Sequence, residues 1–199
     1  MKPGLDLLLA EATFAAFDLE TTGMDPRSDR IVAVGAVRFT HDGAVSDSFD
    51  ELVDPGRSIP ALATSIHGID DRMVRGRPPL EVVLPRFRAF VGEAIPVAHM
   101  AAFDLAFLQG PLRRARLATL ERVLDTAVLA SRLVAPVPEL SLEALCARLG
   151  IGTEGRHTAL GDARIAASLF VGLLPHLEQR AARTLRAALE WGDVTRRVV

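Results

Sequence analysis

The stretch that decides the fold is Thr13–Gly23, T-F-A-A-F-D-L-E-T-T-G, in which an apolar run leads into two acidic residues and a turn. Thr13–Leu19 has the length and composition of a buried strand. Arg30–Phe39, R-I-V-A-V-G-A-V-R-F, is rich in β-branched residues and predicts a second strand, and Ala44–Val53 alternates as a third. A turn signal, H-D-G, separates these two strands. The pattern predicts an antiparallel meander of three strands.

Beyond the meander, the apolar residues switch between strand and helix spacing. Two further short strands are predicted at Ile95–His99 and Arg122–Asp125. The predicted helices are Ala61–Ile66, Asp70–Arg75, Leu80–Val91, Ala102–Arg116, Thr126–Leu133, Leu142–Leu149, Thr158–Leu174 and Glu178–Leu189, the last two separated by Pro175. Strands that come first, and then alternate with helices, predict an α/β fold with a mixed five-stranded sheet flanked by helices.

Composition excludes several classes of protein. The chain has 199 residues, 49% of them hydrophobic and 24% charged, as in one globular domain rather than a disordered or fibrous chain. Its one cysteine, Cys146, excludes a disulfide framework and a cysteine-based zinc site and fits a reducing compartment. A net charge of −2 disfavours an extended coat on duplex DNA but allows a small site that grips a few nucleotides. No apolar run reaches the roughly 20 residues of a membrane span, so we expect a cytoplasmic protein.

Asp18 and Glu20 stand at the end of the first predicted strand. Residues i and i+2 of a strand point to the same side, so both carboxylates project from the strand's C-terminal end, where open α/β sheets bind ligands. Hard divalent cations relieve the repulsion between such carboxylates, and oxygen ligands suit Mg²⁺ or Mn²⁺. The alternative is a pair of solvated acids beside a turn at Thr21 and Thr22. A D-x-E alone favours that alternative, whereas the apolar strand and the T-T-G that flank it favour a metal site.

Three further residues are candidates for the same chemistry. Asp104 is the only acidic or basic residue between Ile95 and Leu108 apart from a histidine, and acids are rarely buried without a partner. Its alternative role is to complement the dipole of its helix. His157 and Asp162 lie in G-R-H-T-A-L-G-D-A, with Asp162 in the second turn of a helix, and they face the same way only if the loop folds back. A histidine beside a metal cluster can accept a proton from water; a loop histidine and a helix-start aspartate are the alternatives.

Together these segments resemble the DEDD superfamily of 3′→5′ exonucleases, and most of all the proofreading epsilon subunits of bacterial DNA polymerase III. The family's motifs D-x-E-T-T-G, H-N-A-x-F-D and H-x-A-x-x-D-A match Asp18–Gly23, His99–Asp104 (except at Met100) and His157–Ala163, in this order. The resemblance covers about residues 12–175 and leaves an N-terminal segment at 1–11 and a C-terminal helix at 176–199. It implies an RNase H-like fold. Because the chain has no tyrosine, it also implies the DEDDh branch, in which a histidine precedes the last aspartate.

The resemblance further implies hydrolysis that depends on two Mg²⁺ or Mn²⁺ ions. The implied metal ligands and catalytic carboxylates are Asp18, Glu20, Asp104 and Asp162, and His157 would take the proton from the attacking water. The second motif departs from the family at Met100, where the family has asparagine. Methionine cannot make the hydrogen bonds of an amide, which puts substrate positioning in question.

A site for the 3′-terminal nucleotide is also implied. Its residues would be Thr21, Thr22, Gly23, Met24, His67 and Phe103. A structural turn role is the alternative for His67. The implied substrate is the 3′ end of single-stranded DNA, with RNA as the alternative, the products are nucleoside 5′-monophosphates, and the role is proofreading or repair. Neither Gln109 nor Gln179 begins a clamp-binding peptide of the epsilon type, so the sequence gives no support for a polymerase partner.

Three other functions remain open on the sequence. An RNA-trimming 3′→5′ exoribonuclease of the same superfamily would use the same carboxylates. A catalytically degenerate nucleic-acid-binding module is favoured only by Met100, and the retention of mutually repelling acids argues against it. An unrelated Mg²⁺ phosphoesterase would require all three motifs to be coincidental.

Overall fold

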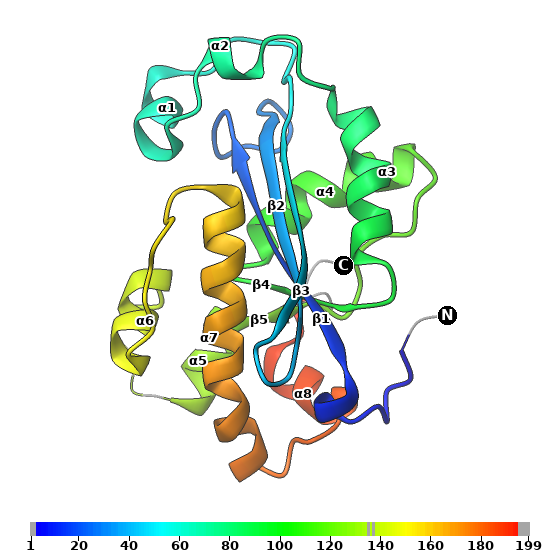
Figure 1. Ribbon diagram of the computed structural model, residues 1–199, viewed down its shortest axis with the longest axis vertical. Helices are drawn as coiled ribbons and strands as arrows, with labels where there is room; N and C mark the ends of the chain where they lie inside the picture. Colours follow the sequence, from blue (N-terminus) through cyan, green and yellow to red (C-terminus); the bar gives the residue numbers. More distant parts are fainter. Residues whose placement is uncertain (1–2, 135, 137, 195–199) are drawn as a thin grey trace.

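A computed structural model describes residues 3–134, 136 and 138–194; the ends of the predicted N-terminal segment and C-terminal helix, residues 1–2 and 195–199, lie outside the described residues. A mixed sheet forms the centre of the fold, with the strand order β3-β2-β1-β4-β5 (Figure 1). The antiparallel meander consists of β1 (Thr13–Thr21), β2 (Ile31–Thr40) and β3 (Val45–Leu52). Strands β4 (Ile95–Ala98) and β5 (Leu124–Asp125) extend the sheet in parallel with β1. The predicted mixed five-stranded sheet is confirmed.

Helices cover both faces of this sheet. Helices α5, α6, α7 and α8 pack on one face, α3 and α4 pack on the other, and α1 and α2 lie beyond the end of the sheet where β1 finishes (Figure 1). No helix in the described part of the chain has the length and apolar composition to cross a bilayer. The bounds of the helices are η1 (Leu9–Glu11), α1 (Ala61–His67), α2 (Asp71–Val74), α3 (Leu80–Val91), α4 (Ala102–Arg114), α5 (Thr126–Leu133), α6 (Leu142–Leu149), α7 (Ala159–Gln179) and α8 (Leu185–Gly192).

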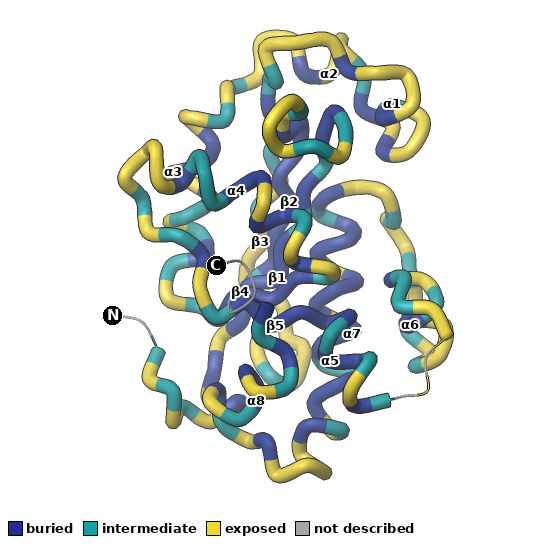
Figure 2. The backbone as a smooth tube through the Cα atoms, turned by 180° about the vertical axis from the view of Figure 1, so that it is seen from behind, coloured by how far each residue is buried: buried dark blue, intermediate teal, exposed yellow. Residues whose placement is uncertain are grey.

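Alternate residues of β1 supply two separate apolar cores. Phe14 points to the α7 side, where its ring lies 4.8 Å from that of Phe170. Phe17 points to the other side, where its ring lies 5.9 Å from that of Phe87 on α3. Burial of one such ring stabilises the fold by about 1.5–3 kcal/mol. Figure 2 shows the buried backbone concentrated in the sheet and α7, so the central strand is fixed from both faces.

The predicted break at Pro175 and the predicted last helix at Glu178–Leu189 are wrong. Helix α7 continues through Pro175 to Gln179, although a proline inside a helix costs about 3 kcal/mol. Pro175 is exposed. Burial of the neighbouring leucines outweighs this cost; they are Leu173, Leu174 and Leu177. The last helix begins after Thr184, whose hydroxyl accepts the N–H of Ala187 (3.3 Å).

A glycine in β2 lets α7 lie directly on the sheet. A Cβ atom on Gly35 would overlap the backbone of Ala159 and Leu160, the first residues of α7. Glycine inside a strand often marks such a close approach of another backbone. Gly35 is paired with Asp18 of β1, so the first turn of α7 is brought next to the end of the central strand.

The turn between β4 and α4 is held by a carboxylate from β5. Asp125 is buried and accepts the backbone N–H groups of Met100 (3.2 Å) and Ala101 (2.9 Å) as well as two N–H groups of α5. Met100 itself has a φ of +53°, in the left-handed region that asparagine tolerates better than other non-glycine residues. Met100 therefore carries backbone strain that an asparagine at the same position would reduce.

We expect Met100→Asn to raise Tm, because asparagine adopts the left-handed conformation with less strain. The gain should be a few tenths of a kcal/mol, or about 1–2 °C. A thermal melt followed by circular dichroism measures it, with Met73→Asn in the right-handed helix α2 as the matched control, which should not raise Tm. A Tm for Met100→Asn below that of the wild type contradicts this account of the turn.

We expect Gly35→Ala to lower the free energy of unfolding by about 1–3 kcal/mol, because the new methyl group meets the backbone of α7 rather than a movable side chain. Urea unfolding measures this change. Gly110→Ala makes the same substitution inside α4, where the nearest atom is the end of the Arg114 side chain at 3.3 Å. It should stabilise the protein through helix propensity. Equal effects from the two substitutions would show that α7 does not press on β2.

Candidate active site

Three carboxylates converge where β1 ends and α7 begins. Asp18 and Glu20 lie on the α7 face of β1, and Asp162 lies in the first turn of α7 rather than in the predicted second turn. One ligand oxygen from each of the three lies within 4.8 Å of the others. The sequence predicted these residues to share one site, and the packing of α7 against Gly35 explains how residues so far apart in the chain meet.

The loop before α7 folds back onto its first turn. A Cβ on Gly161 would overlap the carbonyl group of Gly155, so the absence of a side chain at Gly161 permits this fold. The backbone N–H of His157 donates to Asp162 Oδ1 (3.3 Å). The side chain of His157 is exposed and its φ is +65°, a conformation that clusters at functional sites in residues other than glycine. The loop thus places His157 beside the acidic group.

Asp104 lies beside the three-carboxylate group rather than in it. It sits in the first turn of α4 and is only 3% exposed. Its Oδ1 atom is buried and has no hydrogen-bond partner among the described residues. Its charge adds to the effect of burial in raising the pKa of Asp18. A buried carboxylate oxygen without a partner is costly, and a bound cation would satisfy it.

The cluster is electrostatically strained. Burial raises the pKa of Asp18 well above its usual range, and the charges of Asp104, Asp162 and Glu20 raise it further. Burial, followed by the charge of Asp162, raises the pKa of Glu20 from 4.5 to about 7. Burial also raises the pKa of Asp104 and that of Asp162. Four such groups together favour the binding of protons or cations.

The chemistry of these donors fits hard divalent cations. All four side chains offer oxygen, with no sulfur ligand among them, which suits Mg²⁺ or Mn²⁺. The unpartnered oxygen of Asp104 is the observation that tests this fit, because a purely structural carboxylate would be satisfied by protein donors. Asp18, Glu20 and Asp162 are grouped closely enough to hold one ion, and Asp104 lies outside this group.

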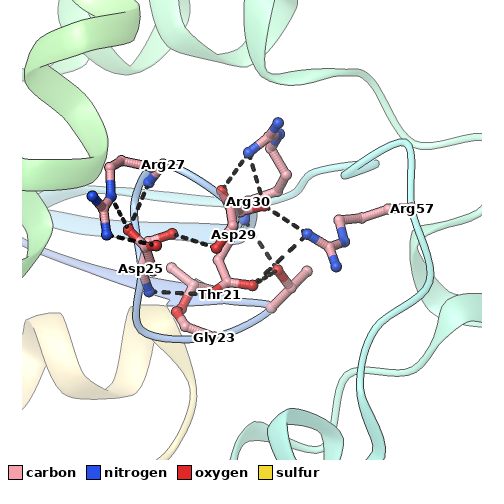
Figure 3. A network of polar contacts seen from close by, with 9 residues as sticks. Thr21, Gly23, Asp25, Arg27, Asp29, Arg30 and Arg57 are labelled. Carbon is pink, nitrogen blue, oxygen red and sulfur yellow. Dashed lines mark hydrogen bonds and ion pairs between the residues drawn. The ribbon is translucent and has the colours of Figure 1, made fainter.

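A network of polar contacts fixes the loop that follows β1 (Figure 3). The Thr21 hydroxyl donates to the carbonyl of Gly23 (2.6 Å). The Asp29 carboxylate accepts from the Thr22 hydroxyl and from the N–H of Asp25, both at 3.0 Å, and its position leaves no room for a side chain on Gly23. The two threonine hydroxyls are therefore used to shape the loop. The sequence interpretation missed Asp29, although its spacing from the T-T-G turn is the signal for such a loop-closing acid.

An open groove of about 300 Å³ runs from Glu20 toward α1. Every residue that the sequence assigned to the terminal nucleotide lines this groove: Thr21, Thr22, Gly23, Met24, His67 and Phe103. Two apolar residues that sequence reasoning missed also line it, Leu62 and Ile66 of α1, which are 75% and 57% exposed. Their i, i+4 spacing on a predicted helix was the available signal.

His67 supports the wall of the groove. It is buried, and its Nδ1 accepts the N–H of Ile69 (3.0 Å). The proton is therefore on Nε2, which donates to the carbonyl of Thr21 (3.3 Å). Burial lowers the pKa of His67, which favours the neutral ring that these two hydrogen bonds require. His67 thus closes the turn after α1 and also lines the groove.

Arg156 is a further member of the site that the sequence interpretation passed over. Its Nη1 bonds Asp162 Oδ2, and its Nε bonds Glu143 Oε1 of α6 at 2.6 Å. Its charge lowers the pKa values of Asp18 and Glu20 in opposition to their burial. The sequence signal was its position directly before His157.

Comparison with known proteins agrees with the geometry. The Exonuclease family model, RNase_T, matches residues 15–170. A DNA polymerase III subunit epsilon-like protein of Rhodobacter capsulatus is 43% identical over 189 residues, which are 91% of this chain and 26% of that protein. A PolC-type DNA polymerase III of Clostridium perfringens is 38% identical over 157 residues, or 79% of this chain and 11% of the relative. The chain thus spans about a quarter or less of the length of these relatives.

Solved structures share the fold. Exonuclease X in complex with 5′ overhanging duplex DNA superposes with a TM-score of 0.68 at 27% identity, covering 88% of this chain and 99% of the other. The nuclease domain of 3′hExo, a DEDDh family member bound to rAMP, gives 0.71 at 16% identity over 92% and 97% of the two chains. The sequence resemblance and the RNase H-like fold are confirmed. Because the family model spans the sheet, the acidic cluster and α7, this chain belongs to the RNase_T Exonuclease family.

Proposed function

We propose that this protein is a metal-dependent 3′→5′ exonuclease that releases nucleoside 5′-monophosphates from the 3′ end of DNA. The observation that carries the proposal is the convergence of Asp18, Glu20 and Asp162 within 4.8 Å, together with the buried Asp104, whose Oδ1 has no hydrogen-bond partner among the described residues. A scaffold protein gains nothing from holding repelling acids together in a buried position. A hydrolase that recruits cations to a phosphodiester does gain from it.

Asp18, Glu20 and Asp162 would hold a first Mg²⁺ or Mn²⁺, and Asp18 with Asp104 would support a second. Two such ions, when bound, supply positive charge to the attacking water and to the leaving 3′ oxygen. The residues of the chain then orient the reaction. His157 stands in the loop bonded to Asp162, and we assign it the role of accepting the proton of the attacking water.

The groove beside Glu20 provides for the 3′-terminal nucleotide. Its apolar lining includes Met24, which is 79% exposed, together with Leu62 and Ile66. Exposed apolar side chains that line a groove offer a surface against which any base can pack without sequence-specific hydrogen bonds. An exonuclease that acts on all sequences requires such a surface. Phe103 of α4 also lines the groove, and its ring lies 5.0 Å from that of Phe107 on the same helix.

DNA is the favoured substrate, with a role in proofreading or repair. The relatives described above are DNA polymerase III proteins, and Exonuclease X was solved with duplex DNA. RNA is the alternative substrate, because the 3′hExo structure holds rAMP. A protein distinguishes RNA from DNA through the 2′-hydroxyl, so the two substrates are compared directly in the test below.

We expect the purified protein to shorten 5′-labelled single-stranded DNA from its 3′ end with Mg²⁺ or Mn²⁺ and not with EDTA. Asp18→Asn should lower the rate at least about 100-fold, because even residues that only orient metal ligands change activity by about 10- to 100-fold. Its melting temperature without metal should not fall, because the substitution removes a repelled charge. A gel time course with matched DNA and RNA measures the rate and the substrate preference.

Asp50→Asn is the matched control for this experiment, since Asp50 is exposed on the edge strand β3 and should leave the rate unchanged. A folded protein with no ladder on either substrate would overturn the proposal. A ladder that persists in Asp18→Asn would show that the acidic cluster is not the active site.

We expect Glu20→Gln to stabilise the protein at pH 8 in EDTA but not at pH 5. The pKa of Glu20 is raised from 4.5 to about 7 in the folded protein. Between these pH values the folded protein keeps a proton on Glu20 that the unfolded chain has lost. Stability from this group is present at low pH and is lost as the pH rises toward 7. The variant avoids that loss, on the order of 2 kcal/mol, or about 4–8 °C in Tm.

Melting curves at the two pH values, with and without Mn²⁺, measure this effect. Mn²⁺ should raise the Tm of the wild type at pH 8 and do little for Glu20→Gln, because one ligand is missing. Glu81→Gln on the exposed side of α3 is the control for removing one glutamate charge. A difference between Glu20→Gln and wild type that is the same at both pH values contradicts the prediction.

A further inference from the structure

Arg156 joins the acidic cluster to a residue outside it. Its guanidinium bonds Asp162 with one nitrogen and Glu143 of α6 with another, the latter at 2.6 Å. Its side chain is 25% exposed, whereas that of Asp162 is 7% exposed, so the pair lies at the edge of the buried group. The fork of an arginine can hold two carboxylates at once, which a lysine cannot do in the same geometry.

The loop that carries Arg156 occupies both oxygens of Asp162. Oδ2 accepts from Arg156, and Oδ1 accepts the backbone N–H of His157 at 3.3 Å. Asp162 is also one of the three carboxylates grouped within 4.8 Å of one another. A divalent cation held by these three would need an oxygen of Asp162 and would lie close to the guanidinium charge.

We propose that Arg156 is an internal counter-cation that competes with the first divalent cation for Asp162 and thereby sets the affinity of the metal site. This inference rests on the proposed metal-dependent function. Arg156 offsets part of the repulsion among Asp18, Glu20 and Asp162, and a metal ion that binds must take its place on Asp162. The affinity of the site is then lower than its carboxylates alone would give.

Glu143 makes this exchange possible. It lies on α6, is not one of the clustered carboxylates, and is about half exposed. A guanidinium displaced from Asp162 stays bonded to Glu143, so its charge remains paired. Without Glu143, displacement would leave Arg156 unpartnered, and metal binding would become harder.

Mn²⁺ titration of the full chain by isothermal calorimetry at pH 8 tests the inference. We expect Arg156→Gln to bind Mn²⁺ about tenfold more tightly than the wild type, because a competing positive charge has been removed. Glu143→Gln should bind it several-fold more weakly. The double variant should bind as Arg156→Gln does, because Glu143 acts only through Arg156.

The competing explanation is that Arg156 merely orients Asp162 as a ligand. Removing an orienting partner weakens metal binding by about 10- to 100-fold, so Arg156→Gln would then have an effect of the opposite sign. That result, or an unchanged affinity, overturns the inference. Arg164→Gln is the matched control, since Arg164 is an exposed arginine two residues beyond Asp162, and its loss should change the affinity less than twofold.

The rise in Tm on adding Mn²⁺ gives a second measure of metal binding. In EDTA, Arg156→Gln should melt below the wild type, and saturating Mn²⁺ should raise its Tm by more than it raises that of the wild type. If Arg156→Gln does not fold, Arg156→Met replaces it: methionine keeps an apolar stem without the competing charge, so this variant should bind Mn²⁺ more tightly than the wild type, and weaker binding refutes the inference. A wild type that binds no Mn²⁺ would instead refute the proposed function.

Discussion

The contact of α7 with the backbone of Gly35 is the constraint on which the rest of the site depends. It brings Asp162 to the end of β1, where Asp18 and Glu20 already stand. These three groups repel one another, so the contact must be held by forces elsewhere. The apolar packing of Phe170 on Phe14 holds it from below the cluster, at about 1.5–3 kcal/mol for each buried ring. The apolar core thus bears the electrostatic strain that the chemistry requires.

Three aspartates with little exposure, Asp125, Asp29 and Asp104, differ in the donors that surround them. Asp125 accepts four backbone N–H groups and fixes the starts of α4 and α5. Asp29 accepts from Thr22 and Asp25 and closes the loop after β1. Asp104, as deeply buried as Asp125, keeps an oxygen without a partner among the described residues. The donors around Asp125 and Asp29 position the backbone, whereas Oδ1 of Asp104 has no such donor and is open to a ligand.

Much of the fold could be predicted because β-branched runs, turn signals and helix spacing agree along most of the chain. The strands of the meander and the bounds of α3, α5 and α6 follow from local pattern alone. The continuation of α7 through Pro175 could not be predicted, because it depends on tertiary burial of leucines rather than on local propensity. The residues of the acidic cluster were found from their motifs. Arg156, Asp29 and Gly35 were not, because each acts through a contact that exists only once a loop has folded back or α7 has packed on the sheet.

The placement of Asp162 on α7 has a consequence for the order in which the protein is made. Asp18 and Glu20 leave the ribosome with the first strand of the sheet, whereas the third carboxylate follows only after all five strands have been synthesised. Contacts between such distant segments form late in folding, because the intervening chain must first be ordered. A nascent or truncated chain that ends before α7 therefore carries the meander and its first two acids without an assembled cation site. The acidic group is therefore complete only once α7 has been made and has packed against Gly35.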